Sequence, residues 1–296
     1  MAFILEVDGL DILRDFLRIL LGAELYSKAR FFLTHHYFCC RSFPRTFSEK
    51  IISRKFDDNP KKYSLFVDKY TVREYVERKI GKEYLIPVVK VKDFLNLNDF
   101  DSLPNEFVIK ASNGGGGKNV LVVEDKEKLD LERLCSDFNR YLKVKMGKIV
   151  DEHFYDIEEP KIIIENRIKN NDRTPLLDYK FHRFHSKGET RYLLQINSEY
   201  NTKNCTKTLY DLNGCKSEIQ FSGYSHGPNT IEIPRNIGEM IEIVDGLAEG
   251  FPYVRIDLFN VDEKIYFGEM TFCPASGWDK INTKENDFLL GSWWGE

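Results

Sequence analysis

Apolar residues that recur at spacings of three and four predict a helix near the start of the chain. The segment is residues 11–33, in which charged residues stand between the apolar ones, so one face is apolar and the other polar. Such a stripe is typical of a buried helix face, although it could instead rest on a membrane surface. Helices are also predicted over residues 64–80, 128–141 and 236–250, and Gly81 is the expected end of the first of these.

Short segments rich in β-branched and aromatic residues predict strands, most of them paired through turns. The predicted strands span residues 85–91, 107–110, 119–123, 161–165, 179–184, 191–196, 253–260 and 264–272. Residues 198–230 are polar and turn-rich, so we expect a mobile or substrate-contacting loop there. Strands grouped in hairpins with helices between them predict an α+β fold rather than a doubly wound parallel sheet.

The composition predicts a globular protein. Of the 296 residues, 42% are hydrophobic and 14% aromatic, which allows a sizeable core and excludes global disorder. No apolar run near the N-terminus approaches the ~20 residues that cross a bilayer. Acidic residues at positions 6, 8 and 11 interrupt any signal-peptide core, so we expect a cytoplasmic protein. The six scattered cysteines lack CxxC spacing and predict neither a disulfide framework nor a zinc site.

Charge is unevenly distributed along the chain. The formal net charge is −4, but residues 12–55 hold nine basic and three acidic residues, whereas residues 232–296 hold five basic and thirteen acidic ones. The basic segment suggests an anionic partner and the acidic segment a bound cation, unless both are solvated faces. Nucleic acid is not an expected partner, because the chain is acidic overall and has no basic stripe with interleaved aromatic residues.

The strongest local signal is a glycine-rich loop between two predicted strands. It comprises Ala111, Ser112, Asn113, Gly114, Gly115, Gly116, Gly117 and Lys118. Its backbone could approach a phosphate closely, although such a loop is equally typical of a flexible hairpin tip. It is not a Walker A loop, because the GxxxxGK(S/T) spacing fails, and a strand follows it where a Rossmann fingerprint needs a helix. Lys110 before the loop and Lys118 after it favour phosphate binding, whereas Lys69 is less informative alone.

Two carboxylates are predicted to face each other on the last hairpin. Alternation places on one face Arg255, Asp257 and Phe259 of the first strand and Ile265, Phe267, Glu269 and Thr271 of the second. A three-residue turn over 262–264 would then set Asp257 opposite Glu269. Opposed carboxylates repel each other, so we expect a cation between them, and oxygen ligands suit Mg²⁺ with Thr271 beside it. The alternative is a salt bridge from either acid to Arg255.

Several motifs, taken in order, resemble a known family. Those of the wider ATP-grasp superfamily are Phe107–Lys110 with its glycine-rich loop, Ile163–Asn166, and Arg255-x-Asp257 followed by Glu269-x-Thr271. Those that resemble the TupA-like ATP-grasp proteins are Pro44–Lys50, Asp68–Val76, Asp178–His182 and Tyr266–Glu269. Such proteins are found among bacterial capsule and cell-wall polysaccharide genes. The resemblance extends from about residue 44 to the end of the chain.

The resemblance implies an ATP-grasp fold, in which a nucleotide lies between two α+β subdomains. It implies a helical N-terminal extension over residues 1–60 and an ATP-grasp domain over residues 61–296. Within that domain, residues of about 105–165 would form a small lid with the glycine-rich loop, and residues 166–296 would bind Mg²⁺ and the acceptor.

The resemblance also implies roles for individual residues, with ATP and Mg²⁺ as cofactors. The implied nucleotide contacts are Lys69 and Lys110 at the phosphates, Ser112 and Lys118 in the loop, Gly114 to Gly117 closing over the phosphates, Glu165 at the ribose and the backbone near Asn166 at the adenine. Asp257 and Glu269 would hold Mg²⁺, and Thr271 stands where the superfamily usually has Asn. The candidates for contact with phosphates or acceptor are Lys180, His182, Arg183, Arg191 and Arg255; as strand residues they could instead be surface charges.

The leading hypothesis is therefore an ATP-dependent carboxylate–amine ligase that forms an amide through an acylphosphate. The resemblance suggests a uronic acid of a surface polysaccharide as acceptor and a small amine or amino acid as partner. The basic segment 12–55 would suit an anionic glycan or a lipid-phosphate-linked precursor at the inner membrane face. A sugar or polysaccharide kinase would need the same ATP site. A glycosyltransferase, without a DxD triplet near the loop, and a non-catalytic nucleotide-binding module are the further alternatives.

Overall fold

The computed structural model describes residues 9–57, 59–115, 117, 119–172, 174–198 and 205–295, with side chains from residue 14 onward. Its α-helices are α1 (Gly9–Leu21), α2 (Ala23–His35), α3 (Phe47–Lys55), α4 (Lys61–Val67), α5 (Val72–Lys79), α6 (Leu131–Tyr141), α7 (Met146–Val150), α8 (Ile237–Leu247) and α9 (Lys284–Trp293). Its strands are β1 (Val88–Lys92), β2 (Phe107–Ala111), β3 (Val120–Val123), β4 (Ile162–Asn166), β5 (Asp178–Ser186), β6 (Glu189–Ser198), β7 (Thr206–Tyr210), β8 (Tyr253–Val261) and β9 (Lys264–Thr271).

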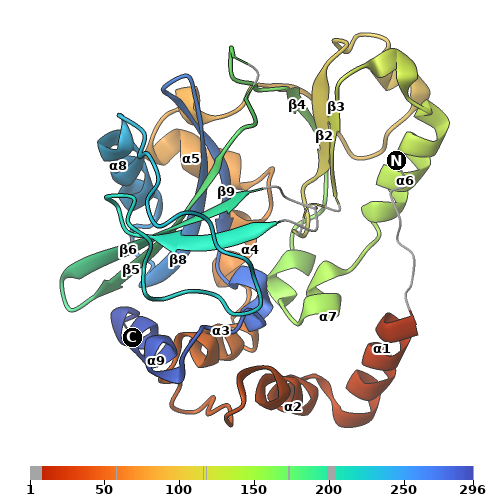
Figure 1. Ribbon diagram of the computed structural model, residues 1–296. Coiled ribbons are helices and arrows are strands. Elements are labelled where there is room, and N and C mark those ends of the chain that lie inside the picture. Colours follow the sequence, from red (N-terminus) through yellow and green to blue (C-terminus); the bar gives the residue numbers. More distant parts are fainter. Residues whose placement is uncertain are drawn as a thin grey trace.

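Two antiparallel sheets form the framework of the molecule (Figure 1). The small sheet has the strand order β1-β4-β2-β3, and the large sheet has the order β7-β6-β5-β8-β9. Neighbouring strands are antiparallel in every pair of both sheets within the described residues. The predicted α+β class is confirmed, and so are the predicted hairpins β2–β3, β5–β6 and β8–β9.

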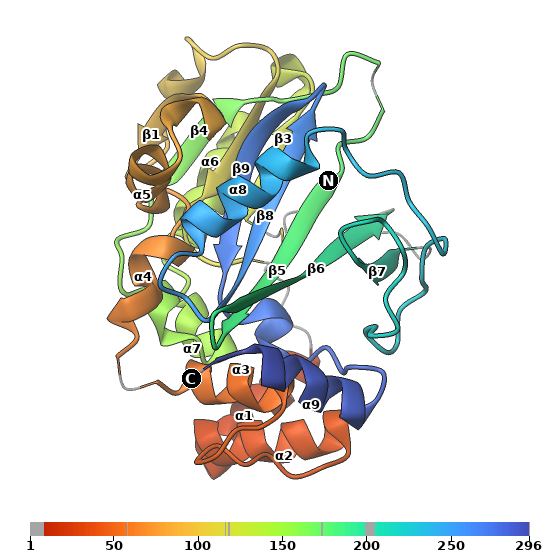
Figure 2. The ribbon, with the colours of Figure 1, turned by 90° about the vertical axis from the view of Figure 1, so that its left-hand side faces the viewer.

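The large sheet is buried on both faces, but by different kinds of residue. Val254, Ile256 and Leu258 of β8 point into the main hydrophobic core, which α5 and α8 complete. Figure 2 shows α8 lying across this face of the sheet. Arg255 and Asp257 alternate with these residues and are also buried, on the opposite face. Because an unpaired buried charge is very unfavourable, that second face requires ionic partners.

The small sheet repeats this division into an apolar and a polar face. Phe107, Ile109 and Ala111 of β2 are buried against α6 in a second hydrophobic core. Val108 and Lys110 point to the other side, toward the large sheet. Each sheet therefore covers its apolar face with helices and turns its polar face toward the other sheet.

Helix α9 packs against the segment that leads into α3. The carboxylate of Asp287 accepts hydrogen bonds from the N–H of Ser48 (2.9 Å) and from the hydroxyl of Tyr37 (2.7 Å). A Cβ on Gly291 would lie 2.0 Å from the carbonyl oxygen of Arg45, so only glycine permits this approach. Helix α9 thus holds in place the start of α3 and the residues before it.

Two predicted helices are each divided into two. The segment 11–33 breaks at Gly22, whose φ of 75° is rarely adopted by other residues, and becomes α1 and α2. The segment 64–80 becomes α4 and α5, with an interruption over residues 68–71. Both breaks escaped prediction because apolar spacing continues across them.

The predicted three-residue turn between β8 and β9 is wrong. Only Asp262 and Glu263 form the turn, with φ of 50° and 67°. Positive φ at both positions is the feature of the tight two-residue hairpin turn. Val261 therefore pairs with Lys264 rather than with Ile265.

A bulge in β9 restores the register that this shorter turn would have shifted. The pairing skips Gly268, so Asp257 lies opposite Glu269 as predicted. Phe267 pairs with Leu258 and belongs to the apolar core, not to the face of Glu269. The predicted common face for Phe267 and Glu269 is therefore wrong.

Two further elements differ from the sequence-based expectations. Strand β7 lies inside the segment 198–230, which we expected to be a loop. Strand β1 pairs with β4, so the small sheet begins before the predicted lid boundary near residue 105. Among the described residues, no helix is long and apolar enough to cross a membrane.

Candidate active site

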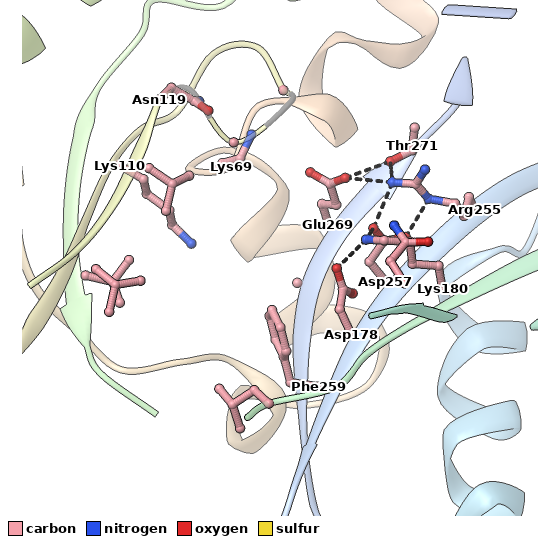
Figure 3. A pocket seen from close by; sticks show the side chains of 18 of the residues that line it. Lys69, Lys110, Asn119, Asp178, Lys180, Arg255, Asp257, Phe259, Glu269 and Thr271 are labelled. Carbon is pink, nitrogen blue, oxygen red and sulfur yellow. Dashed lines mark hydrogen bonds and ion pairs between the residues drawn. The ribbon is translucent and has the colours of Figure 1, made fainter. Parts of the chain in front are cut away.

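A cleft of about 1250 Å³ lies between the polar faces of the two sheets. Lysines from the small-sheet side face a cluster of charged residues on the large sheet (Figure 3). Apolar side chains such as Val108, Val122 and Phe259 also line the cleft. It therefore combines surface for a flat apolar group with charges for an anionic one.

Lys69 enters the cleft from the interruption between α4 and α5. Asp68 is extended there, and its carboxylate accepts hydrogen bonds from the N–H groups of Tyr70 (2.9 Å) and Thr71 (3.0 Å). The N–H of Lys69 donates to the carbonyl of Ser112 (3.0 Å), which ties the break to the small sheet. Burial lowers the pKa of the Lys69 ammonium, so an incoming anion would meet a poorly solvated cation.

The described part of the glycine-rich loop is held at its base. Nδ2 of Asn119 donates to the carbonyls of Ala111 (2.8 Å) and Asn113 (2.7 Å). Nζ of Lys69 donates to the carbonyl of Gly114 at 2.5 Å. These hydrogen bonds hold the base of the loop against Lys69, which is predicted to contact phosphate.

Ser112 supports this arrangement and does not line the cleft. Its buried hydroxyl donates to the carboxylate of Asp68 and accepts from the N–H of Lys161 (2.9 Å). Of the other predicted loop residues, Gly115 and Gly117 line the cleft, whereas Gly116 and Lys118 lie outside the described residues.

Lys110 and Glu165 face the cleft as a pair. Nζ of Lys110 lies 2.6 Å from Oε2 of Glu165, and a guanidinium nitrogen of Arg73 lies 3.0 Å from Oε1. The side chain of Glu165 is 2% exposed, so two cations neutralise a buried carboxylate here. Asn166 follows it and also lines the cleft.

An ionic cluster occupies the facing surface of the large sheet. Arg255 donates to both carboxylate oxygens of Asp257 (2.7 and 2.8 Å) and to Oε1 of Glu269 (2.8 Å). It also donates to the hydroxyl of Thr271 at 3.0 Å. Nζ of Lys180 donates to Asp257 at 2.6 Å. The structure thus contains the salt bridges that we considered as the alternative to a cation between the acids.

The same cluster includes Asp178, which the sequence analysis did not select as a site residue. Lys180 forms an ion pair with Asp178 as well as with Asp257. Burial and the charge of Asp257 raise the pKa of Asp178 to about 6. Burial would also raise the pKa of Asp257, but Arg255 and Lys180 outweigh it and hold that pKa below its ordinary value.

The donor set fits a magnesium ion that arrives with a phosphate ligand. Among the described residues, Oδ1 of Asp178 is buried without a hydrogen-bond partner, and no hydrogen bond reaches Oε2 of Glu269. No group of three or more His, Cys, Asp or Glu within these residues is arranged to hold a metal ion alone. Mg²⁺ needs only one or two protein carboxylates when phosphates and water complete its octahedron.

The segment after α7 contributes another buried carboxylate to the lining of the cleft. Glu152 is 3% exposed and accepts a hydrogen bond from the hydroxyl of Ser276. Burial raises the pKa of Glu152 to about 7, although the nearby ammonium of Lys55 opposes this rise. Tyr155 also lines the cleft, and burial together with the charges of Glu152 and Glu269 raises the pKa of its phenol well above the ordinary value.

Two predicted site residues lie away from the cleft. His182 is 2% exposed and forms hydrogen bonds with the hydroxyl of Tyr253 (2.9 Å) and with Oε1 of Gln195 (3.0 Å). Burial lowers the pKa of His182 to about 3, so the ring is neutral beneath the ionic cluster. Arg191 pairs with Glu189 at 2.9 Å on the outer part of β6 and is not among the residues that line the cleft.

Arg183 also points away from the cleft. It lies on the helix-covered face of β5, and its guanidinium pairs with Asp245 of α8 at 3.2 Å.

Comparison with protein families decides what kind of chain this is. The family model described as TupA-like ATPgrasp matches residues 49–294. This chain belongs to the TupA-like ATP-grasp family. The matched range contains every residue of the cleft described above, and the predicted ATP-grasp fold is confirmed.

Solved structures similar to this TupA-like chain are more distant. An N5-carboxyaminoimidazole ribonucleotide synthetase in complex with ADP has 15% identity and a TM-score of 0.45, covering 71% of this chain and 46% of its own. A D-alanine–D-alanine ligase from Helicobacter pylori has 17% identity and a TM-score of 0.42, covering 77% and 59%. The chain thus spans about half the length of these structures. A comparison with curated proteins finds no match.

Asp178 and Glu152 of this TupA-like protein were not predicted as site residues from the sequence. Asp178 lies inside the motif Asp178–His182, and its spacing of two from Lys180 on a strand could have placed both on one face. Glu152 had no such signal, because it lies in an irregular segment and reaches the cleft only through the tertiary fold.

Proposed function

We propose that this TupA-like protein is an ATP- and Mg²⁺-dependent carboxylate–amine ligase. One observation carries the proposal: Lys69, from the break between α4 and α5, and Lys110 of β2 face a cluster of three carboxylates and two cations across one cleft. Such an arrangement suits the transfer of a highly charged phosphoryl group, which depends on positioning and charge neutralisation.

The small-sheet side would bind the nucleotide. Lys69 and Lys110 supply ammonium groups for phosphate oxygens, and the glycine-rich loop supplies backbone N–H groups. Glu165 would accept from the ribose hydroxyls, which requires that Lys110 exchange its contact with Glu165 for a phosphate. The apolar surface near Val108 and Phe259 suits the adenine ring.

The large-sheet side would hold Mg²⁺ and the reacting groups. Asp257 and Glu269, with Thr271 beside them, would be the ligands, and the ion supplies charge neutralisation at the phosphates. Arg255 is already desolvated between the two acids, so it is positioned to contact negative charge that develops during transfer. Lys180 keeps Asp257 ionised by its own charge.

The chemistry itself would proceed in two balanced steps. A carboxylate oxygen of the acceptor forms a bond to the γ-phosphorus, the bond to the bridging oxygen breaks, and ADP leaves. An amine nitrogen then forms a bond to the acyl carbon, phosphate leaves with the electron pair of the broken C–O bond, and the amine loses a proton. No nucleophilic side chain is needed in either step.

The proposed acceptor is a uronic acid of a bacterial surface polysaccharide, and the amine is a small amine or amino acid. The TupA-like resemblance supports this choice. Glu152, which lines the cleft, supports an amine as well, because a buried carboxylate stabilises an ammonium group and can accept its proton.

The test is incubation with Mg²⁺, ATP and glucuronate or galacturonate together with ammonia, glycine or glutamate. Mass spectrometry and phosphorus NMR should detect ADP, free phosphate and an amide. A phosphoester instead would assign a sugar kinase, and AMP would contradict acylphosphate chemistry. Asp257→Asn and Glu269→Gln should each lower turnover at least 100-fold, whereas Glu189→Gln, on the exposed end of β6, is the matched control. Unchanged turnover in both acid variants would show that the metal assignment is wrong.

A further inference from the structure

Helix α1 contacts the rest of the protein through its charged face. The guanidinium of Arg18 forms an ion pair with Asp151 and donates to the carbonyl of Ile149 at 3.3 Å. A surface helix ordinarily does the reverse and buries its apolar face. The polar side of α1 is therefore committed to an intramolecular contact.

The apolar face of α1 is exposed as a consequence. Phe16 is 60% exposed, Ile19 84% and Leu20 68%. Their spacings of three and four place them on one side of the helix, and Arg18 lies on the other side. These side chains are far too exposed to serve as a core face.

Further exposed apolar side chains lie on α2 and on the segment that follows it. Together with those of α1 we call them the docking patch, which comprises Phe16, Ile19, Leu20, Leu25, Phe32, Leu33, Phe38 and Phe43. The rings of Phe32 and Phe38 stack with their centroids 4.7 Å apart, so α2 and the loop after it present one surface. Helices α1 and α2 lie together at one end of the molecule (Figures 1 and 2).

The charge of the same segment has the opposite sign from the remainder of the protein. Residues 14–45 contain six Lys or Arg and two Asp or Glu, a net charge of +4 in a chain of net charge −4, of which the ion pair between Arg18 and Asp151 leaves +3. Apolar side chains bordered by basic ones are the composition of helices that lie in the interface of an anionic bilayer. In a symmetric dimer built on this patch, the basic segment of one copy would face the basic segment of the other, and their charges would repel.

We propose that the docking patch binds the surface of an anionic membrane, with α1 and α2 lying in the interface. Each of these helices has 13 residues, which suits lying in the plane of the bilayer and not crossing it. The contact would also place the cleft near the lipid, because Asp151, which holds α1, directly precedes Glu152 in the cleft. A membrane-linked acceptor could then reach the site from that side.

Vesicle sedimentation tests the proposal without any knowledge of the substrate. The full chain is mixed with vesicles of phosphatidylcholine alone, or with 30% phosphatidylglycerol, in 0.1 and 0.5 M NaCl. We expect most of the protein in the pellet with the anionic vesicles at low salt, and a partition coefficient at least fivefold lower with neutral vesicles or high salt. Recovery of the wild type in the supernatant under all conditions would overturn the proposal.

Matched variants locate the contact. Ile19→Ser with Leu33→Ser removes apolar surface from the docking patch, and the partition coefficient should fall at least tenfold. The control is Phe94→Ser with Leu289→Ser, which are 56% and 43% exposed elsewhere and should leave binding unchanged. Circular dichroism and ATP binding establish that each variant is folded. Equal loss in both double variants, or a wild-type dimer that becomes monomeric only in the patch variant, would contradict membrane docking.

Discussion

The carboxyl of Glu152 allows the electrostatics of the cleft to be measured directly. It is 3% exposed, and burial raises its pKa from 4.5 to about 7 despite the opposing effects of Lys55 and Ser276. The substitution Glu152→Gln keeps the size and polarity of the side chain and removes its ionisation. The stability of this variant relative to the wild type should therefore depend on pH.

The sign and size follow from proton linkage. Below pH 4.5 the carboxyl is protonated in the folded and unfolded states. Between pH 4.5 and about 7 only the unfolded state loses the proton, so the wild type becomes less stable as the pH rises. One pKa unit corresponds to about 1.4 kcal/mol, so the whole shift amounts to about 3 kcal/mol. The free energy of unfolding of Glu152→Gln minus that of the wild type should rise by this amount between pH 4.5 and pH 8.

Urea unfolding followed by tryptophan fluorescence at half-unit pH intervals measures this difference. The same substitution at the exposed Glu132 is the matched control for loss of a surface carboxylate. A difference that stays constant across the range would show that Glu152 ionises as it does in water. A difference of opposite slope would show that attraction to Lys55 outweighs burial. Either result would refute the description of this part of the cleft.

Two other predictions concern the nucleotide side. Lys110→Ala should weaken ATP binding about 10- to 100-fold in calorimetry, because one charge-assisted contact to phosphate is lost. Arg73 still neutralises Glu165 in this variant. Wild-type affinity would contradict a phosphate role for Lys110. Gly114→Ala should lower stability by about 1–2 kcal/mol in thermal or urea unfolding, because φ is 75° and the added Cβ would lie 2.7 Å from Cγ of Met146. Gly115→Ala is its control, since the nearest atom would be 4.0 Å away, and equal losses would show that the loop conformation differs from the one described.

Local periodicity was sufficient to predict the antiparallel hairpins. It places Asp257 and Glu269 opposite each other only if the register of the last hairpin is right, because a shift of one residue moves a side chain to the other face. The register was right for a reason that the sequence did not reveal. The real turn is one residue shorter than predicted, and the bulge at Gly268 adds one residue back. Gly268 inside a strand was the available signal for that bulge.

Tertiary contacts account for what could not be predicted. Lys69 lies at a helix break that depends on the carboxylate of Asp68, and apolar spacing alone does not detect such a break. Alternation along the strands places His182 and Arg191 on the same face of the large sheet as Lys180. Nevertheless, Tyr253 covers His182, and Arg191 lies beyond the edge of the cleft. The position of a residue along a strand predicts on which face of the sheet its side chain lies. Whether that side chain also lines the cleft depends on how far the small sheet extends opposite it.

The contact between α9 and the start of α3 has a consequence for the order of assembly during synthesis. The N–H of Ser48 and the hydroxyl of Tyr37 obtain their acceptor from Asp287, which the ribosome adds 239 residues after Ser48. The segment that carries the docking patch is therefore synthesised before Asp287, and these two donors lack this acceptor until Asp287 has been added. A nascent chain would thus carry the apolar and basic patch while every strand of the cleft is still being made, so it could meet a lipid surface before the cleft is complete.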